Sequence, residues 1–329
     1  MAGWARRMGM GLLVSAGLLG ILEVASRLLL PAIPDPAASQ PTEDAMEPSA
    51  TLGWVPKPGE SRAFGVPGRT WINAQRTRNP EFTPPKAGEK RLLTIGDSTV
   101  YGVLVNDREV FGSVAASKLQ RKLNTPVTAI NGGIPGYSSE QSMRLLRGPL
   151  ADVPFDYLVV ATQWSDSQPA DAPDAWRFSR VGAAVSEVMF SSGLYRLLDY
   201  ALVGPRSAEV VEWELHAEPG SRRVPLRAYR RNLHAFADIA RDRGAEPVYL
   251  VLPSDRDLRR EPLEPPRPEY RDALREVAAA EEALLIDGAT PFAGGDRSLM
   301  LDDVHPSRGG HRLLGDTLSG ALLPLLQGQ

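Results

Sequence analysis

The chain has 329 residues and an apolar content of 43%, enough for one large domain with appendages or for two small domains. Its 37 basic and 40 acidic side chains leave a net charge of −3, which provides no electrostatic footprint for a nucleic acid. The absence of cysteine excludes disulfides, thiolate metal sites, cysteine nucleophiles and a lipid-modified cysteine anchor.

The most hydrophobic segment lies near the N-terminus, at residues 8–30, directly behind Arg6 and Arg7. A helix of about 20 apolar residues is long enough to cross the hydrocarbon core of a bilayer. The basic pair in front of it predicts that the N-terminus lies in the cytoplasm and the rest of the chain outside. We therefore expect residues 1–31 to form a transmembrane anchor that holds a periplasmic or cell-surface domain.

Two charges interrupt this segment, Glu23 and Arg27, at a spacing that lets them pair on one face of a helix near the membrane interface. Residues 24–26, Val-Ala-Ser, resemble a weak cleavage site, so a removed signal peptide and a secreted protein are the first alternative. A helix that packs on the soluble domain is the second.

Residues 32–50 are rich in Pro, Ala, Ser and acidic side chains and predict an extended linker. The main domain is then expected over residues 51–329. Residues 71–73, Trp-Ile-Asn, favour a short edge strand, and residues 79–86 form a second proline-rich connection into the main sheet.

From Arg91 onward, strand-like and helix-like segments alternate, which predicts a doubly wound parallel sheet of five strands. The strands are expected at residues 91–95, 126–130, 156–162, 247–252 and 284–286, and the helices at residues 111–123, 141–150, 226–243, 269–282 and 308–326.

Residues 165–225 do not fit this alternation. They contain one expected helix, at residues 193–203, and otherwise loops. An insertion of this length beside the strand ends is often a lid or a specificity element. A surface excursion with only a packing role is the equally weighted alternative.

A serine follows the first strand of the predicted sheet. Residues 91–95 are an apolar run, and Gly96 permits a tight turn in front of Asp97 and Ser98. The carboxyl ends of the strands are where open α/β sheets bind ligands. Ser98 is therefore a candidate nucleophile, with helix capping as its alternative role.

A serine hydroxyl needs a base, and an imidazole base needs a carboxylate to hold its tautomer. Among the four histidines, His305 stands three residues after Asp302 in a loop. This spacing allows the carboxylate to accept from Nδ1 while Nε2 faces outward. Asp303 is the competing carboxylate, and we favour Asp302.

The remaining histidines are expected elsewhere. His216 lies in the charged insertion, His234 lies among polar residues of a helix, and His311 lies in the last helix. The first two are expected at the surface.

Taken together, three motifs in chain order resemble the SGNH (GDSL-type) hydrolase superfamily. They are Gly-Asp-Ser at residues 96–98, Asn-x-Gly-x-x-Gly at residues 131–136 and Asp-x-x-His-Pro at residues 302–306. The resemblance covers residues 91–326 and extends weakly upstream to membrane-anchored bacterial members. It implies a flavodoxin-like three-layer α/β/α sandwich with a shallow, exposed site.

The resemblance also implies roles: Ser98 as nucleophile, His305 as base, Asp302 as its carboxylate and Gly136 as an oxyanion-hole glycine. The backbone N–H groups of Ser98 and Gly136 supply two oxyanion donors. The family's third donor is an asparagine, and Ser165 stands at that position here, with Gln163 as a possible substitute. Loss of one donor costs about 10²- to 10³-fold in rate.

The sequence therefore predicts a serine esterase or acylhydrolase that deacylates a carbohydrate or lipid ester outside the cytoplasm, through an acyl-serine intermediate. It calls for neither a metal nor an organic cofactor. One alternative is an O-acyltransferase that modifies envelope polysaccharides with the same acyl-enzyme. The other is a non-catalytic binding module on the same fold, which the missing asparagine would favour.

Overall fold

The structure is a computed structural model, and it describes residues 2–29, 45–49, 51–61, 64, 70–170, 172–179, 181, 192–195, 197–198 and 222–328. Its centre is a five-stranded sheet in the order β6-β5-β7-β8-β9, in which every neighbouring pair is parallel. The strands are β5 (Lys90–Gly96), β6 (Val127–Gly133), β7 (Tyr157–Ala161), β8 (Glu246–Val251) and β9 (Leu284–Asp287). This is the flavodoxin-like strand order, so the predicted doubly wound parallel sheet is confirmed.

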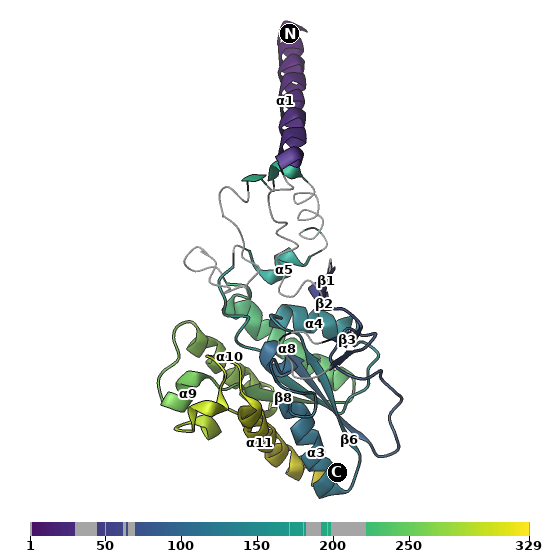
Figure 1. Cartoon of the computed structure of the whole chain (residues 1–329), viewed down its shortest axis with the longest axis vertical. Coiled ribbons are helices and arrows are strands. Elements are labelled where there is room, and N and C mark those ends of the chain that lie inside the picture. Colours follow the sequence, from purple (N-terminus) through teal and green to yellow (C-terminus); the bar gives the residue numbers. More distant parts are fainter. Residues whose placement is uncertain are drawn as a thin grey trace.

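Helices cover both faces of the sheet (Figure 1). They are α3 (Phe111–Leu123), α4 (Ser139–Arg147), α8 (Leu226–Asp242), α10 (Arg267–Ala280) and α11 (Arg308–Gln327). Each lies within a few residues of its predicted range. Short elements that the sequence did not predict complete the domain: α2 (Ser98–Tyr101), α5 (Asp174–Arg177), α9 (Asp255–Arg259), η3 (Thr290–Phe292) and η4 (Arg297–Leu299).

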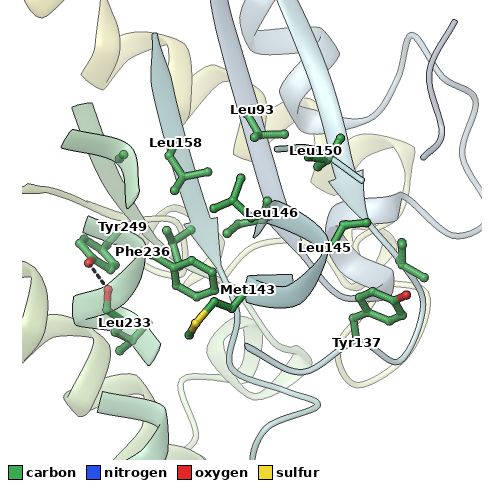
Figure 2. Packing of buried hydrophobic residues seen from close by; sticks show 14 of the residues in the cluster. Leu93, Tyr137, Met143, Leu145, Leu146, Leu150, Leu158, Leu233, Phe236 and Tyr249 are labelled. Atoms are coloured by element: carbon green, nitrogen blue, oxygen red, sulfur yellow. Dashed lines mark hydrogen bonds between the residues drawn. The ribbon is translucent and has the colours of Figure 1, made fainter. Parts of the chain in front are cut away.

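Alternate residues of the buried strands supply two separate hydrophobic cores, as expected for a sheet covered on both faces. Leu93 of β5 and Leu158 of β7 pack with the helices α4, α8 and α10 (Figure 2). Leu92 and Val159, their neighbours in sequence, face the other way and pack with α3 and α11. The central strands are therefore largely apolar, with Thr94 of β5 as a buried exception, and most of their polar residues lie at the strand ends.

Two small antiparallel sheets precede the central sheet in the chain. One pairs β1 (Met46–Ser49) with β2 (Gly53–Pro56), and the other pairs β3 (Gly59–Ser61) with β4 (Thr70–Ile72). The strand predicted at residues 71–73 is present as β4, one residue earlier. The predicted linker, residues 32–50, is wrong at its end, because β1 is an ordered strand paired with β2.

The predicted N-terminal helix is present as α1 (Ala2–Leu29), which lies at the end of the molecule away from the sheet (Figure 1). Glu23 accepts hydrogen bonds from the backbone N–H groups of Gly193 and Leu194, at 2.8 and 3.0 Å. Over the part of the chain that the structure describes, no helix combines the length and the apolar character of a membrane span. The predicted transmembrane anchor is thus not supported by the structure.

The predicted insertion, residues 165–225, is described at its two ends and in a short segment around residues 192–198. Residues 193–195 and 197–198 are helical, in agreement with the start of the predicted helix, while residues 182–191 and 199–221 lie outside the described residues. The returning chain pairs Arg222 with Pro169 in an antiparallel bridge. The prediction of a lid concerns residues that are not described.

Glycines allow the ends of β5 and β6 to approach their neighbours closely. A Cβ atom on Gly96 would lie 2.3 Å from the carbonyl oxygen of Ala161 on β7. A Cβ atom on Gly133 would lie 2.3 Å from the backbone nitrogen of Tyr101 in α2. Because these neighbours are backbone atoms, they cannot rotate away, and both positions require glycine.

We predict that Gly133→Ala destabilises the protein by about 1–3 kcal/mol, because the new methyl group forces α2 away from β6. Gly320→Ala is the control: this residue lies in α11, and a Cβ atom there would meet open space, so helix propensity should stabilise the variant by up to about 1 kcal/mol. Urea unfolding measures both changes. Equal stability of the Gly133→Ala variant and the unsubstituted protein would contradict the steric argument.

Candidate active site

Ser98 is the first residue of α2, immediately after β5. Asp97 caps this helix: its side chain accepts a hydrogen bond from the backbone N–H of Thr99 at 3.0 Å. Asp97 is 1% exposed, and burial raises the pKa of its carboxyl, against the hydrogen bonds that it accepts. Asp97 therefore organises the turn, and Ser98, the residue that follows it, is partly exposed.

The other end of α2 is held by a buried arginine. Arg78 is 4% exposed and donates to the carbonyl oxygens of Tyr101, Gly102 and Val105, at 2.9, 2.7 and 2.7 Å. Its Nε also pairs with Asp107 at 2.6 Å. The first two carbonyls belong to the last residue and the C-cap of a helix too short to satisfy them internally, and the third lies in the loop that follows, so the guanidinium stabilises the conformation that presents Ser98.

The loop that carries His305 is ordered by Asp302. One carboxylate oxygen accepts from the backbone N–H groups of Val304 and His305, at 3.0 and 2.9 Å, and the other lies 2.7 Å from Nδ1 of His305. The hydroxyl of Thr99 donates to the carbonyl of Val304 at 3.1 Å, which ties this loop to α2.

The structure brings the three predicted residues together. Nε2 of His305 lies 2.7 Å from Oγ of Ser98, and Nδ1 lies 2.7 Å from Oδ2 of Asp302. An ionised carboxylate can only accept, so Nδ1 carries the ring proton and Nε2 presents its lone pair to the serine hydroxyl. The side chains of His305 and Asp302 are 23% and 54% exposed, so the site is open to solvent.

The electrostatics agree with this assignment. Burial acts to raise the pKa of Asp302, but the hydrogen bond and the charge of His305, together with the two backbone N–H groups, lower that pKa to about 2. Burial acts to lower the pKa of His305, but Asp302, and then the charge of Asp97, raise it above its ordinary value of 6.5. The histidine is thus a stronger base than a free imidazole.

Gly136 lies in a tight turn that is joined to the end of β5. The N–H of Tyr137 donates to the carbonyl of Ile134 at 3.0 Å, and the N–H of Ile134 donates to the carbonyl of Gly96 at 3.1 Å. Gly136 has a φ of 76°, the left-handed value that the third position of a type II turn requires, and Pro135 occupies the favoured second position. The turn and the segment that leads to Ser98 are therefore both attached to Gly96.

The two candidates for a third oxyanion donor, Ser165 and Gln163, form hydrogen bonds with other residues. The hydroxyl of Ser165 donates to Asp97, over a long 3.4 Å. The side-chain amide of Gln163 donates to the carbonyl of Leu252 at 3.4 Å and accepts from its N–H at 3.3 Å. Both side chains are used in these other hydrogen bonds, so the third-donor prediction gains no support.

Asp303, the alternative to Asp302, points away from the histidine. It forms an ion pair with Arg267, which lies with Arg271 over the ring of Trp164, at 5.5 and 5.7 Å. Trp164 is 5% exposed and belongs to the hydrophobic core on the α3–α11 side of the sheet. Asp303 thereby fixes the histidine loop against α10.

The other histidines stand apart from the site. His234 is a half-exposed partner of Glu281, and His311 is buried in α11, where its ring stacks on Phe111. Burial lowers the pKa of His311 to about 3, with smaller contributions from the charges of Arg78 and His305. His216 lies outside the described residues.

Sequence reasoning missed the buried side chains that hold the loops. Arg78 stands at the edge of a proline-rich connection, and Arg223 ends the predicted insertion, so both were expected in loops. Arg223 is 1% exposed, pairs with Asp174 at 2.8 Å and donates to the carbonyl of Gly136 at 2.6 Å. No periodicity marks such residues, because their partners lie far away in the chain.

No protein-family model matches the chain, and no curated protein matches it. Solved structures do resemble it. A protein from Desulfitobacterium hafniense described as lipolytic and of the G-D-S-L family shares 16% identity, covering 71% of this chain and 99% of its own, with a TM-score of 0.46. A lipase/acylhydrolase from Enterococcus faecalis shares 18% sequence identity with this chain; the match covers 72% of this chain and 96% of that protein, with a TM-score of 0.47. An acetylxylan esterase from Geobacillus stearothermophilus shares 15% sequence identity; the match covers 71% of this chain and 94% of that protein, with a TM-score of 0.46. At these identities and scores the similarity assigns no activity to this chain.

We predict that the imidazole of His305 titrates above pH 6.5 and that Asp302→Asn lowers its pKa, because the hydrogen bond to a negative charge is lost. An NMR titration of the histidine ring signals measures both values. His311 is the internal control, since its signal should stay unchanged from about pH 5 to pH 9. A His305 pKa that Asp302→Asn leaves in place would contradict the pairing.

Proposed function

We propose that the protein is a serine ester hydrolase of the SGNH type, in which Ser98 is the nucleophile. The observation that carries this proposal is the 2.7 Å distance between Nε2 of His305 and Oγ of Ser98, with Asp302 on the opposite ring nitrogen. A base within hydrogen-bond reach of a serine, itself oriented by a carboxylate, is the arrangement that activates a hydroxyl for acyl transfer.

In the first half of the reaction, His305 takes the hydroxyl proton as Ser98 Oγ attacks the ester carbonyl. The tetrahedral intermediate collapses, the alcohol leaves with the proton from His305, and the acyl group stays on Ser98. In the second half, His305 takes a proton from water, the resulting hydroxide attacks the acyl-serine, and the carboxylic acid departs as Ser98 regains its proton. Asp302 stabilises the transient imidazolium in both halves.

The negative oxygen of each tetrahedral intermediate needs preorganised donors. The backbone N–H groups of Ser98 and Gly136 fill this role, and no described hydrogen bond uses either of them. An oxyanion hole with these two backbone donors and no side-chain amide predicts slower catalysis than a hole with three donors. The fixed glycine turn compensates in part, because its N–H needs no reorganisation.

The open position of the site supports an ester with a large alcohol portion, such as a carbohydrate or a lipid, and a small acyl group. His305 and Asp302 are both accessible from outside, so the alcohol can extend into solvent while the carbonyl reaches Ser98. Transfer of the acyl group to a sugar hydroxyl instead of water would require only a different second acceptor.

We also propose that this domain works outside the cytoplasm. The support is the sequence of residues 1–31, in which a basic pair precedes an apolar run.

For this location, we expect the full chain, expressed in a bacterium with a C-terminal tag, to be cleaved by protease added to cells whose outer envelope has been opened. A cytoplasmic protein in the same cells is the control and should resist. A tag that is protected to the same extent as the control would contradict the location.

We predict that Ser98→Ala lowers the hydrolysis of p-nitrophenyl acetate by at least about 10³-fold without changing the melting temperature. Ser319→Ala, which removes a hydroxyl bonded to the carbonyl of Asp316 within α11, is the matched control and should retain full activity. Mass spectrometry of the acid-quenched unsubstituted protein should show an acetyl group on Ser98. Equal, negligible rates for Ser98→Ala and the unsubstituted protein would instead indicate a binding module.

A further inference from the structure

We propose that Trp54 is a positioning residue of the oxyanion hole: its indole N–H fixes the Pro135–Gly136 peptide so that the N–H of Gly136 faces the reacting carbonyl. This inference rests on the proposed function. Trp54 belongs to β2, which pairs with β1 and lies outside the central sheet.

The decisive contact is the hydrogen bond from Nε1 of Trp54 to the carbonyl oxygen of Pro135, at 3.0 Å. This oxygen and the N–H of Gly136 belong to the same planar peptide unit. In a trans unit the two groups point in opposite directions. Trp54 holds the oxygen on its own side, and the N–H must therefore point away from the indole, out of the turn.

The turn does not determine this orientation by itself. A turn closed by the bond between Ile134 and Tyr137 can place its central peptide in the type I or the type II orientation, which differ by a rotation of that peptide. Proline at the second position suits both types, and glycine at the third accepts positive and negative φ. The indole contact exists only when the carbonyl of Pro135 faces Trp54, so it selects the type II form with the observed φ of 76° at Gly136.

The flipped peptide would be harmful to catalysis. It would place the carbonyl oxygen of Pro135 where the N–H of Gly136 now stands, and a partial negative charge would then face the developing oxyanion. Of the two proposed backbone donors, only that of Ser98 would remain. The choice between the two orientations therefore decides whether the hole contains two donors or one.

A second contact fixes the next peptide of the same turn. Arg223 donates from Nη1 to the carbonyl of Gly136 at 2.6 Å, and its other nitrogens bind Asp174 and Gln141. With Trp54 on one side and Arg223 on the other, the carbonyl groups before and after Gly136 are both held by side chains.

Trp54 is itself rigidly placed. It is 7% exposed, its ring meets the ring of Tyr137 edge to face at 5.7 Å, and the guanidinium of Arg223 lies 5.9 Å from it. The hydroxyl of Tyr137 donates to the backbone carbonyl of Trp54 at 2.5 Å. A donor held from several sides can orient a peptide at little entropic cost.

The test uses the full chain with Trp54→Phe, which keeps an aromatic ring beside Tyr137 but removes the indole N–H. We expect kcat for p-nitrophenyl acetate to fall by about 10- to 10²-fold, approaching the loss of one oxyanion donor, while KM changes less than about twofold. A boronic acid, whose tetrahedral adduct on Ser98 places an oxygen in the hole, should bind more weakly by a similar factor.

Tyr249→Phe is the matched control. It removes another buried hydrogen bond from an aromatic side chain to a backbone carbonyl, that of Leu233 at 2.8 Å, on the core side of α8 (Figure 2). It should lower the melting temperature without changing kcat or boronate affinity. If Trp54→Phe does not fold, the same measurements are made on Trp54→benzothienylalanine, in which sulfur replaces the indole N–H in a ring of the same shape.

A loss of kcat and of boronate affinity in the position-54 variant, but not in Tyr249→Phe, supports the inference. Unchanged kcat in the folded variant, with Ser98→Ala inactive, overturns the role of Trp54 and leaves the proposed function intact. Full activity of Ser98→Ala overturns both. A fall in activity that follows melting temperature equally in both variants also overturns the inference, since it indicates stability alone.

Discussion

The arrangement of the site depends on how closely β5 approaches its neighbours at its carboxyl end. Gly96 touches β7 and Gly133 touches α2, in each case through backbone atoms that leave no room for a side chain. The carbonyl of Gly96 also receives the N–H of Ile134, at the start of the turn that carries Gly136. Because Ser98 follows Gly96 by two residues and the turn is hydrogen-bonded to the same glycine, backbone geometry sets the distance between Ser98 and the turn.

Two buried arginines keep these loops rigid although the site is open to solvent. Arg78 holds the carbonyls at the end of α2, and Arg223 holds the carbonyl of Gly136. Each is paired with a carboxylate, Asp107 or Asp174, which offsets the cost of burying its charge. Removing either partner alone would leave an uncompensated buried charge, so the loss of one member would destabilise the whole network.

The sequence predicted the central sheet and the meeting of Ser98, Asp302 and His305, because apolar periodicity and local spacing encode both. It was incomplete where the outcome depends on distant partners. The role of Ser165 in place of an asparagine stays a prediction, and in the structure its hydroxyl donates to the buried Asp97. Arg223 is 87 residues from its acceptor Gly136, so no local sequence pattern could predict this hydrogen bond. The linker prediction missed β1 because this segment is a strand through its pairing with β2, and the composition of residues 46–49 does not indicate that pairing.

Trp54 and Arg78 both come before Lys90, where the central sheet begins. A fragment cut at that strand would retain every strand of the sheet together with the serine, the histidine and the aspartate. It would nevertheless lose the Arg78 contacts at the end of α2 and the Trp54 contact on the Gly136 turn, and of these side-chain contacts it would keep only that of Arg223. A fragment that keeps all of these contacts therefore includes the β1–β2 hairpin, so a junction for trimming this chain or grafting its core onto another partner belongs upstream of Met46.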